Sequence, residues 1–173
     1  MRSLAVLAAM ALVACAPADA EDQSVEESPT PAATPTPTIE VRAEWETAVD
    51  FDLHVRNDHM GTTFAADTLL PWDCTYQNNN PDWGCTHSGD ADQTSGLIPY
   101  VETATVRIGP TLTIGLERFS GEGASMPRVV VVSNGTTLAD YTHANYDDNY
   151  IWVVGSYSSA GVFTLINTLE PRP

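Results

Sequence analysis

Beyond residue 38 the apolar residues alternate with polar ones or form short β-branched runs, and no stretch keeps the period of a helix. In the clearest alternation, Phe51, Leu53 and Val55 face one side of a strand, while Asp50, Asp52 and His54 face the other. This pattern predicts an all-β domain of about eight strands: Ile39–Trp45, Phe51–Arg56, Val101–Ile108, Thr111–Phe119, Arg128–Val132, Thr136–Tyr141, Tyr150–Ser156 and Gly161–Thr168.

Turn residues separate three pairs of these strands. Gly109-Pro110, Asn134-Gly135 and the segment 158–161 each predict a hairpin, and Asn-Gly is the strongest of the three signals. The expected architecture is a jelly-roll-like sandwich of two antiparallel sheets. A closed barrel with the same number of strands is the alternative.

The N-terminal residues are typical of an export signal. Arg2 precedes the apolar run Leu4–Val13, which is too short to cross a bilayer as a permanent helix, so residues 1–14 are predicted to be a signal peptide. The run ends in Leu12-Val13-Ala14-Cys15, which resembles the lipobox of bacterial lipoproteins. The resemblance implies that Cys15 is lipidated and becomes the new N-terminus. Ala16, in place of an inner-membrane retention Asp, implies attachment to the outer membrane.

Cleavage after Ala20 in Ala18-Asp19-Ala20 is the alternative, and it would discard Cys15. We favour lipidation because it explains the odd number of cysteines, three. Residues 15–38 then form an acidic Pro/Thr linker, which cannot bury enough apolar area to fold and would lift the domain 39–173 off the membrane.

The charge balance excludes some partners. The chain carries a formal net charge of -16, and its seven basic residues are all arginine. Nucleic acid is therefore not an expected partner. The expected partners are the membrane, through the lipid anchor, and an envelope polymer or a surface protein.

The segment between Arg56 and Ile98 is long and irregular, and something specific must order it. Cys74 and Cys85 lie in this loop and would reach an oxidising compartment after export, so we predict a disulfide between them. A metal-thiolate site would need four ligands, and His87 makes only three.

Calcium is the second candidate for ordering the loop. Calcium binds carboxylate and amide oxygens, which are frequent in the loop and on the polar side of the second strand. The predicted ligands are Asp50, Asp52, Asp73, Asn80, Asp82, Asp90 and Asp92. Crowded carboxylates need a counter-charge, and the chain contains no lysine. The alternative is that these residues only make turns and cap strands.

Several motifs together resemble a secreted bacterial domain that is similar in outline to the pre-peptidase C-terminal β-sandwich. They are the block Asp50-Phe51-Asp52-Leu53-His54-Val55, the pair Asp73-Cys74 and the block Asn80-Pro81-Asp82-Trp83-Gly84. The resemblance implies a β-sandwich binding or stabilising module and adds Glu102 to the metal ligands. Thr103 stands where the pattern has Asn.

Catalytic motifs are not recognisable. The sequence has no G-x-S-x-G elbow and no H-E-x-x-H spacing, so we predict that the protein is not an enzyme; an unrecognised hydrolase is the weakest alternative. Trp72 and Trp83 raise the possibility of a carbohydrate-binding surface, although packing of the loop explains them as well. The expected function is that of a calcium-stabilised, lipid-anchored binding or structural module of the cell envelope.

Overall fold

The computed structural model describes residues 38–65, 69–89, 98–107 and 109–172. These residues form strands and connecting loops, and none of them forms an apolar helix long enough to cross a membrane. Pro35–Pro173 form one compact unit. The strands are β1 (Thr38–Trp45), β2 (Asp50–Asn57), β3 (Asp73–Cys74), β4 (Cys85–His87), β5 (Tyr100–Arg107), β6 (Leu112–Ser120), β7 (Arg128–Ser133), β8 (Thr136–Thr142), β9 (Tyr150–Tyr157) and β10 (Phe163–Pro171).

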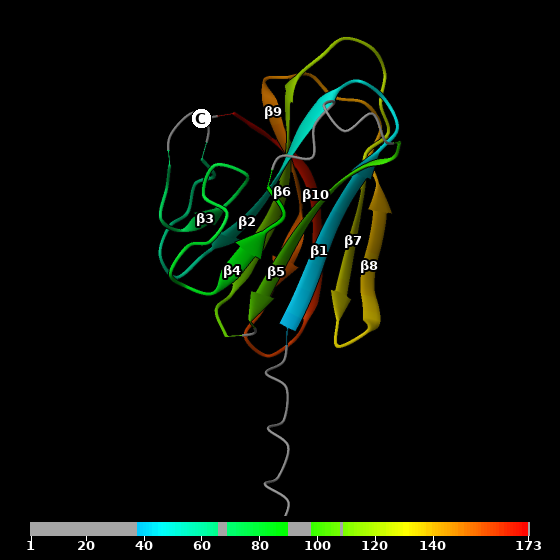
Figure 1. The fold of residues 1–173 in the computed structure, drawn as a ribbon. Helices are drawn as coiled ribbons and strands as arrows, with labels where there is room; N and C mark the ends of the chain where they lie inside the picture. Colours follow the sequence, from blue (N-terminus) through cyan, green and yellow to red (C-terminus); the bar gives the residue numbers. More distant parts are fainter. Residues whose placement is uncertain (1–37, 66–68, 90–97, 108, 173) are drawn as a thin grey trace, which may run out of the picture. The chain divides into compact units, whose positions relative to one another are not determined.

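The strands form two antiparallel sheets that pack face to face (Figure 1). Sheet A has the order β4-β5-β1-β7-β8, and sheet B has the order β10-β9-β6-β2-β3. Trp45, Phe51 and Trp152, together with branched aliphatic residues from both sheets, fill the space between them. The predicted two-sheet sandwich is confirmed. Its two extra strands, β3 and β4, are short and lie inside the long loop.

One predicted hairpin is wrong. Val101–Ile108 and Thr111–Phe119 do not pair, because β5 belongs to sheet A and β6 to sheet B. The turn at Gly109-Pro110 reverses the chain but passes it from one sheet to the other. The burial of β6 explains this placement: Leu112 to Arg118 are buried on both faces, as expected for a central strand between β2 and β9.

The other two hairpins are confirmed. At the β7–β8 turn, Asn134 and Gly135 have φ angles of 48° and 78°, the left-handed values that a two-residue type I′ turn requires. The β9–β10 pair follows from the turn at 158–161.

The predicted disulfide between Cys74 and Cys85 is confirmed, and it joins the two sheets. Cys74 lies on β3 at one edge of sheet B, and Cys85 lies on β4 at one edge of sheet A. Cys74 is paired in register with Val55, and Cys85 with Val106, so both sulfurs point into the core. The bond therefore closes the sandwich along one side.

We predict that the double substitution Cys74→Ala, Cys85→Ala lowers the free energy of unfolding by about 3 kcal/mol, because the unfolded chain gains the entropy of the open loop. Denaturant unfolding of the oxidised wild type and of the variant measures the difference. A reductant should destabilise the wild type by a similar amount and leave the variant unchanged. Equal stability of the two proteins would contradict the structural role of the bond.

Candidate functional site

Ionisable side chains form a buried row across the outer face of sheet B, the face that points away from sheet A. Nδ1 of His54 lies 2.9 Å from Oδ2 of Asp73, and its Nε2 lies 3.3 Å from Oε2 of Glu117. Nε of Arg172 lies 2.6 Å from Oε1 of Glu117. His54, Asp73 and Glu117 are at most 3% exposed. The ring of Phe64, with its centroid 5.7 Å from that of His54, belongs to the segment that covers this face.

The electrostatics of the row keep His54 positively charged. Burial lowers the pKa of His54, but Asp73 and Glu117 outweigh that effect through charge and hydrogen bonding and raise the pKa from 6.5 to about 10. His54 therefore supplies a positive charge beside two crowded carboxylates, in a chain that has no lysine. Sequence analysis placed His54 on the face opposite Leu53, and it does lie on the outer face of sheet B. His54 is nevertheless buried, because the segment carrying Phe64 covers this face.

A second histidine lies between the sheets and is neutral. Glu102 on β5 accepts a hydrogen bond from the Leu53 N–H at 2.7 Å, and Nε2 of His87 lies 3.6 Å from the same oxygen. The Gly89 N–H donates to Nδ1 of His87 at 3.1 Å, so we assign the ring proton to Nε2. Burial, followed by the nearby charge of His54, lowers the pKa of His87 from 6.5 to about 4.

The opposite pKa shifts of these two histidines predict that the free energy of unfolding is largest near pH 6.5. The pKa of His54 is higher in the folded protein than in the unfolded chain. Its contribution to the free energy of unfolding is therefore complete below pH 6.5 and is lost as the pH rises toward 10. The pKa of His87 is lower in the folded protein than in the unfolded chain. Its contribution to the free energy of unfolding is therefore complete above pH 6.5 and is lost as the pH falls toward 4.

Unfolding free energies measured from pH 4 to pH 10 test this. We expect a fall of a few kcal/mol between pH 6.5 and pH 10 in the wild type, since each pKa unit corresponds to about 1.4 kcal/mol. His54→Gln should flatten this alkaline fall, whereas His59→Gln, at an exposed position, should not. An unchanged alkaline limb in His54→Gln would overturn the assignment.

The predicted calcium ligands fall into different groups. Asp73 belongs to the buried row and Glu102 to the pair with His87, while Asp82 and Asn80 are exposed on a turn. Asp52 is buried and lies opposite Glu117 in the β2–β6 register, and Asp50 accepts a hydrogen bond from Ser120. Within the described ranges, no three His, Cys, Asp or Glu side chains are arranged to hold a metal ion. Asp90, Asp92 and the lipidation residue Cys15 lie outside the described residues, so calcium binding stays a prediction.

The two tryptophans of the loop make contacts inside it. The indole N–H of Trp72 donates to the carbonyl of Thr63 at 2.9 Å, and that of Trp83 donates to the carbonyl of Pro71 at 3.1 Å. Gly61 packs against the ring of Trp72, because a Cβ atom there would lie 2.3 Å from the indole. Trp83 packs against the main core. Both contacts agree with the loop-packing interpretation; ligand binding by Trp72 and Trp83 stays a prediction.

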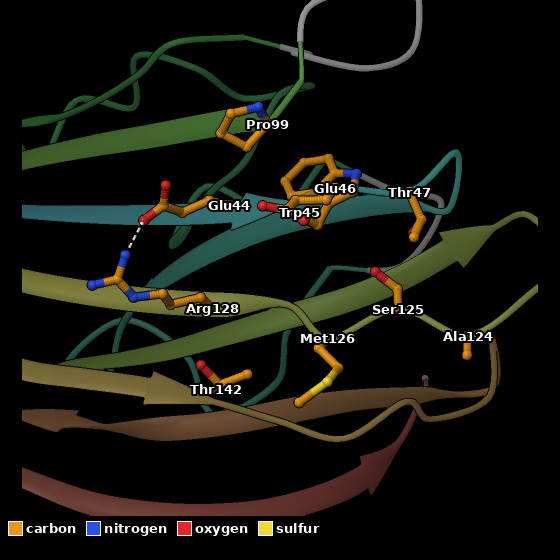
Figure 2. A pocket seen from close by; sticks show the side chains of 10 residues that line it. All are labelled: Glu44, Trp45, Glu46, Thr47, Pro99, Ala124, Ser125, Met126, Arg128 and Thr142. Carbon is orange, nitrogen blue, oxygen red and sulfur yellow. Dashed lines mark hydrogen bonds and ion pairs between the residues drawn. The ribbon is translucent and has the colours of Figure 1, made fainter.

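A pocket that sequence analysis missed lies at one end of the sandwich, at the edge of the outer face of sheet A (Figure 2). We call it the loop-end pocket. It has a volume of about 480 Å³. Glu44, Arg128 and Thr142 lie side by side across β1, β7 and β8, as their register shows. The β1–β2 and β6–β7 loops and the start of β5 provide its other walls. Its lining residues are Glu44, Trp45, Glu46, Thr47, Pro99, Ala124, Ser125, Met126, Arg128 and Thr142.

Two hydroxyl groups in this pocket have no hydrogen-bond partner in the described structure. Ser125 is 2% exposed, and its Oγ is buried and unpaired, as is Oγ1 of Thr47. Figure 2 shows both oxygens directed into the space between their two loops. Native structures pair nearly all such groups with protein atoms, ordered water or a ligand, and these two oxygens face the same cavity.

Ion pairs connect the side chains on the charged side of the pocket. Arg128 makes a two-pronged ion pair with Asp140, with both N–O distances 2.7 Å, and a third contact to Glu44 at 2.8 Å. No local motif marks this group, because Glu44 and Arg128 are 84 residues apart in the sequence.

Arg118 fixes the loop that carries Ser125. Its guanidinium is buried and donates to the carbonyls of Gly121 and Tyr146 at 2.6 and 2.7 Å. It also donates to Oδ1 of Asn145, which accepts the Ser125 N–H as well. Gly121 allows the β1–β2 and β6–β7 loops to touch, since a Cβ atom there would lie 2.9 Å from the carbonyl oxygen of Ala48.

We predict that Gly121→Ala is more destabilising than Gly123→Ala by roughly 1–2 kcal/mol, because it adds a clash with the β1–β2 loop. Both glycines have positive φ angles, 98° and 107°, but a Cβ atom at Gly123 would meet nothing within 4 Å. The pair of variants therefore separates the contact from the backbone strain. If denaturant unfolding shows that Gly121→Ala and Gly123→Ala lose the same free energy of unfolding, the β1–β2 and β6–β7 loops are not in contact at Gly121.

Comparisons with known proteins show the fold only. No protein-family profile matches the chain, and no curated protein matches it. A crystal structure of a protein of unknown function, SAV2460, is similar with a TM-score of 0.52 at 15% sequence identity, over 78% of this chain and 88% of that one. At this identity the similarity supports the sandwich architecture and carries no information on activity.

Proposed function

We propose that the protein is a non-enzymatic lipoprotein of the cell envelope whose β-sandwich binds a ligand in the loop-end pocket. In this proposal Cys15 carries the lipid, residues 15–38 form the linker and the sandwich is the binding module. The outer membrane is the proposed site of attachment.

The position of the pocket carries the proposal. β1 begins at Thr38, where the linker joins the domain, and it ends at Trp45 in the wall of the pocket (Figure 1). Eight residues of extended strand separate the two points by about 25 Å. A domain tethered at Thr38 would therefore present the pocket at its opposite end, where a lipid surface does not block access.

The chemistry of the buried histidines supports a role in binding rather than catalysis. His54 is positively charged at neutral pH and cannot accept a proton, and His87 is enclosed between the sheets beside Glu102. Neither of them lines the loop-end pocket. No histidine lines the pocket, and Oγ of Ser125 has no hydrogen bond to a described residue that would activate it as a nucleophile.

The anchor is tested by growing a bacterial host that processes lipoproteins with labelled palmitate. We expect the full-length protein to carry the label and to sediment with the membranes, whereas Cys15→Ala carries none. Ala20→Tyr, which blocks the alternative cleavage, should be labelled like the wild type. An unlabelled wild type with Glu21 at its N-terminus would overturn the anchor.

A further inference from the structure

We infer that the loop-end pocket binds an uncharged sugar unit of a glycan. This inference rests on the proposed function, because it names the ligand class of the same pocket. It follows from the unpaired hydroxyls, the charges, the apolar wall and the strands that form the pocket.

The unpaired hydroxyls select a ligand that both donates and accepts hydrogen bonds. Thr47 and Ser125 each offer one donor and two acceptor positions from buried oxygens. A hydrocarbon ligand would leave both groups unpaired. A sugar hydroxyl has the same dual character and can pair with both of them.

The charges of the pocket disfavour an anionic ligand. Glu44 and Glu46 contribute two negative charges and Arg128 one positive charge, which leaves the lining with a net charge of -1. Glu44 and Asp140 already neutralise Arg128, and the whole chain carries -16. A carboxylated or phosphorylated glycan would meet repulsion both locally and from the whole protein.

The wall that carries Ser125 is also apolar and accessible. Met126 is 69% exposed, and Ala124 in the same loop is exposed as well (Figure 2). A pyranose ring presents C–H groups on its faces and hydroxyls around its edge. The ring can therefore lie against Met126 while its edge reaches Thr47 and Ser125.

The strands that line the pocket disfavour a peptide as the ligand. β1 and β7 are each paired on both sides, and β8, which is an edge strand, lines the pocket only with its last residue, Thr142. An extended peptide usually adds along a free strand edge, and the pocket offers only one residue of such an edge. Recognition must therefore come from side chains, which suits a compact ligand rich in hydroxyls.

Calorimetric titration of the full-length protein in detergent micelles tests the inference. The probes are four uncharged trisaccharides: maltotriose, cellotriose, mannotriose and N,N′,N″-triacetylchitotriose. Trigalacturonic acid and trilysine serve as the anionic and the basic comparison. We expect at least one uncharged trisaccharide to bind, with no binding of either charged probe.

Three variants connect binding to the pocket. Ser125→Ala and Thr47→Val should each weaken binding about 3- to 10-fold, as expected for one neutral hydrogen bond. Neither should lower the melting temperature, because each removes a buried hydroxyl that has no partner in the protein. Ser159→Ala, at an exposed turn at the opposite end of the sandwich, should bind like the wild type.

Binding of none of the uncharged trisaccharides would overturn the inference, as would binding that both hydroxyl variants leave unchanged. Binding of trilysine or trigalacturonic acid that depends on Ser125 would assign the pocket to another ligand class. A protein that carries palmitate but binds no sugar would refute only the ligand class, whereas one that binds sugar without palmitate would refute only the anchor.

Discussion

The contact between Asp73 and His54 determines how the irregular part of the chain packs on the sandwich. The carboxylate of Asp73 accepts from the His54 ring and from the Ala65 N–H, so it joins β3 both to β2 and to the covering segment. The next residue, Cys74, forms the disulfide to the edge of the other sheet. Two consecutive residues thus attach the loop to sheet B by charge and to sheet A by a covalent bond.

This arrangement explains how an acidic domain that has no lysine can bury carboxylates. Burying Asp73 and Glu117 would be costly if they were unpaired, because a buried charge without a partner loses its hydration. His54 and Arg172 supply that partner charge from β2 and from the residues after β10. Asp73 is one of the predicted calcium ligands, and His54 supplies it with a positive charge from the chain itself.

The sequence was sufficient for the class of fold and for the disulfide, because both depend on local information. Alternation of apolar residues identified β1 and β2, Asn134-Gly135 identified the β7–β8 turn, and export together with cysteine number predicted the bond. The partners of the two strands on either side of Gly109-Pro110 could not be predicted from local sequence. A turn dipeptide reports that the chain reverses, but the neighbour of each strand depends on which faces the rest of the molecule buries.

The two sites were beyond sequence analysis for the same reason. The row on sheet B collects residues from β2, β3, β6 and the residue after β10, and alternation in β2 indicated only that His54 and Leu53 face opposite ways. Alternation shows which side chains share a face but does not show whether a later segment covers that face. The loop-end pocket joins Glu44 to Arg128 and Thr47 to Ser125, and each pair comes from strands or loops far apart in the chain.

The use of arginine connects the fold with the proposed envelope role. Arg118 binds loop carbonyls, Arg128 binds Asp140 and Glu44, and Arg172 binds Glu117, so the fold itself uses these positive charges. Arg42 and Arg56 are also paired, with Glu44 and Asp58. The domain surface is therefore acidic, and it would be repelled by anionic headgroups at short range. A lipid at Cys15 and a linker before Thr38 would then hold the domain near the membrane while its charge keeps it off the surface, which leaves the loop-end pocket accessible.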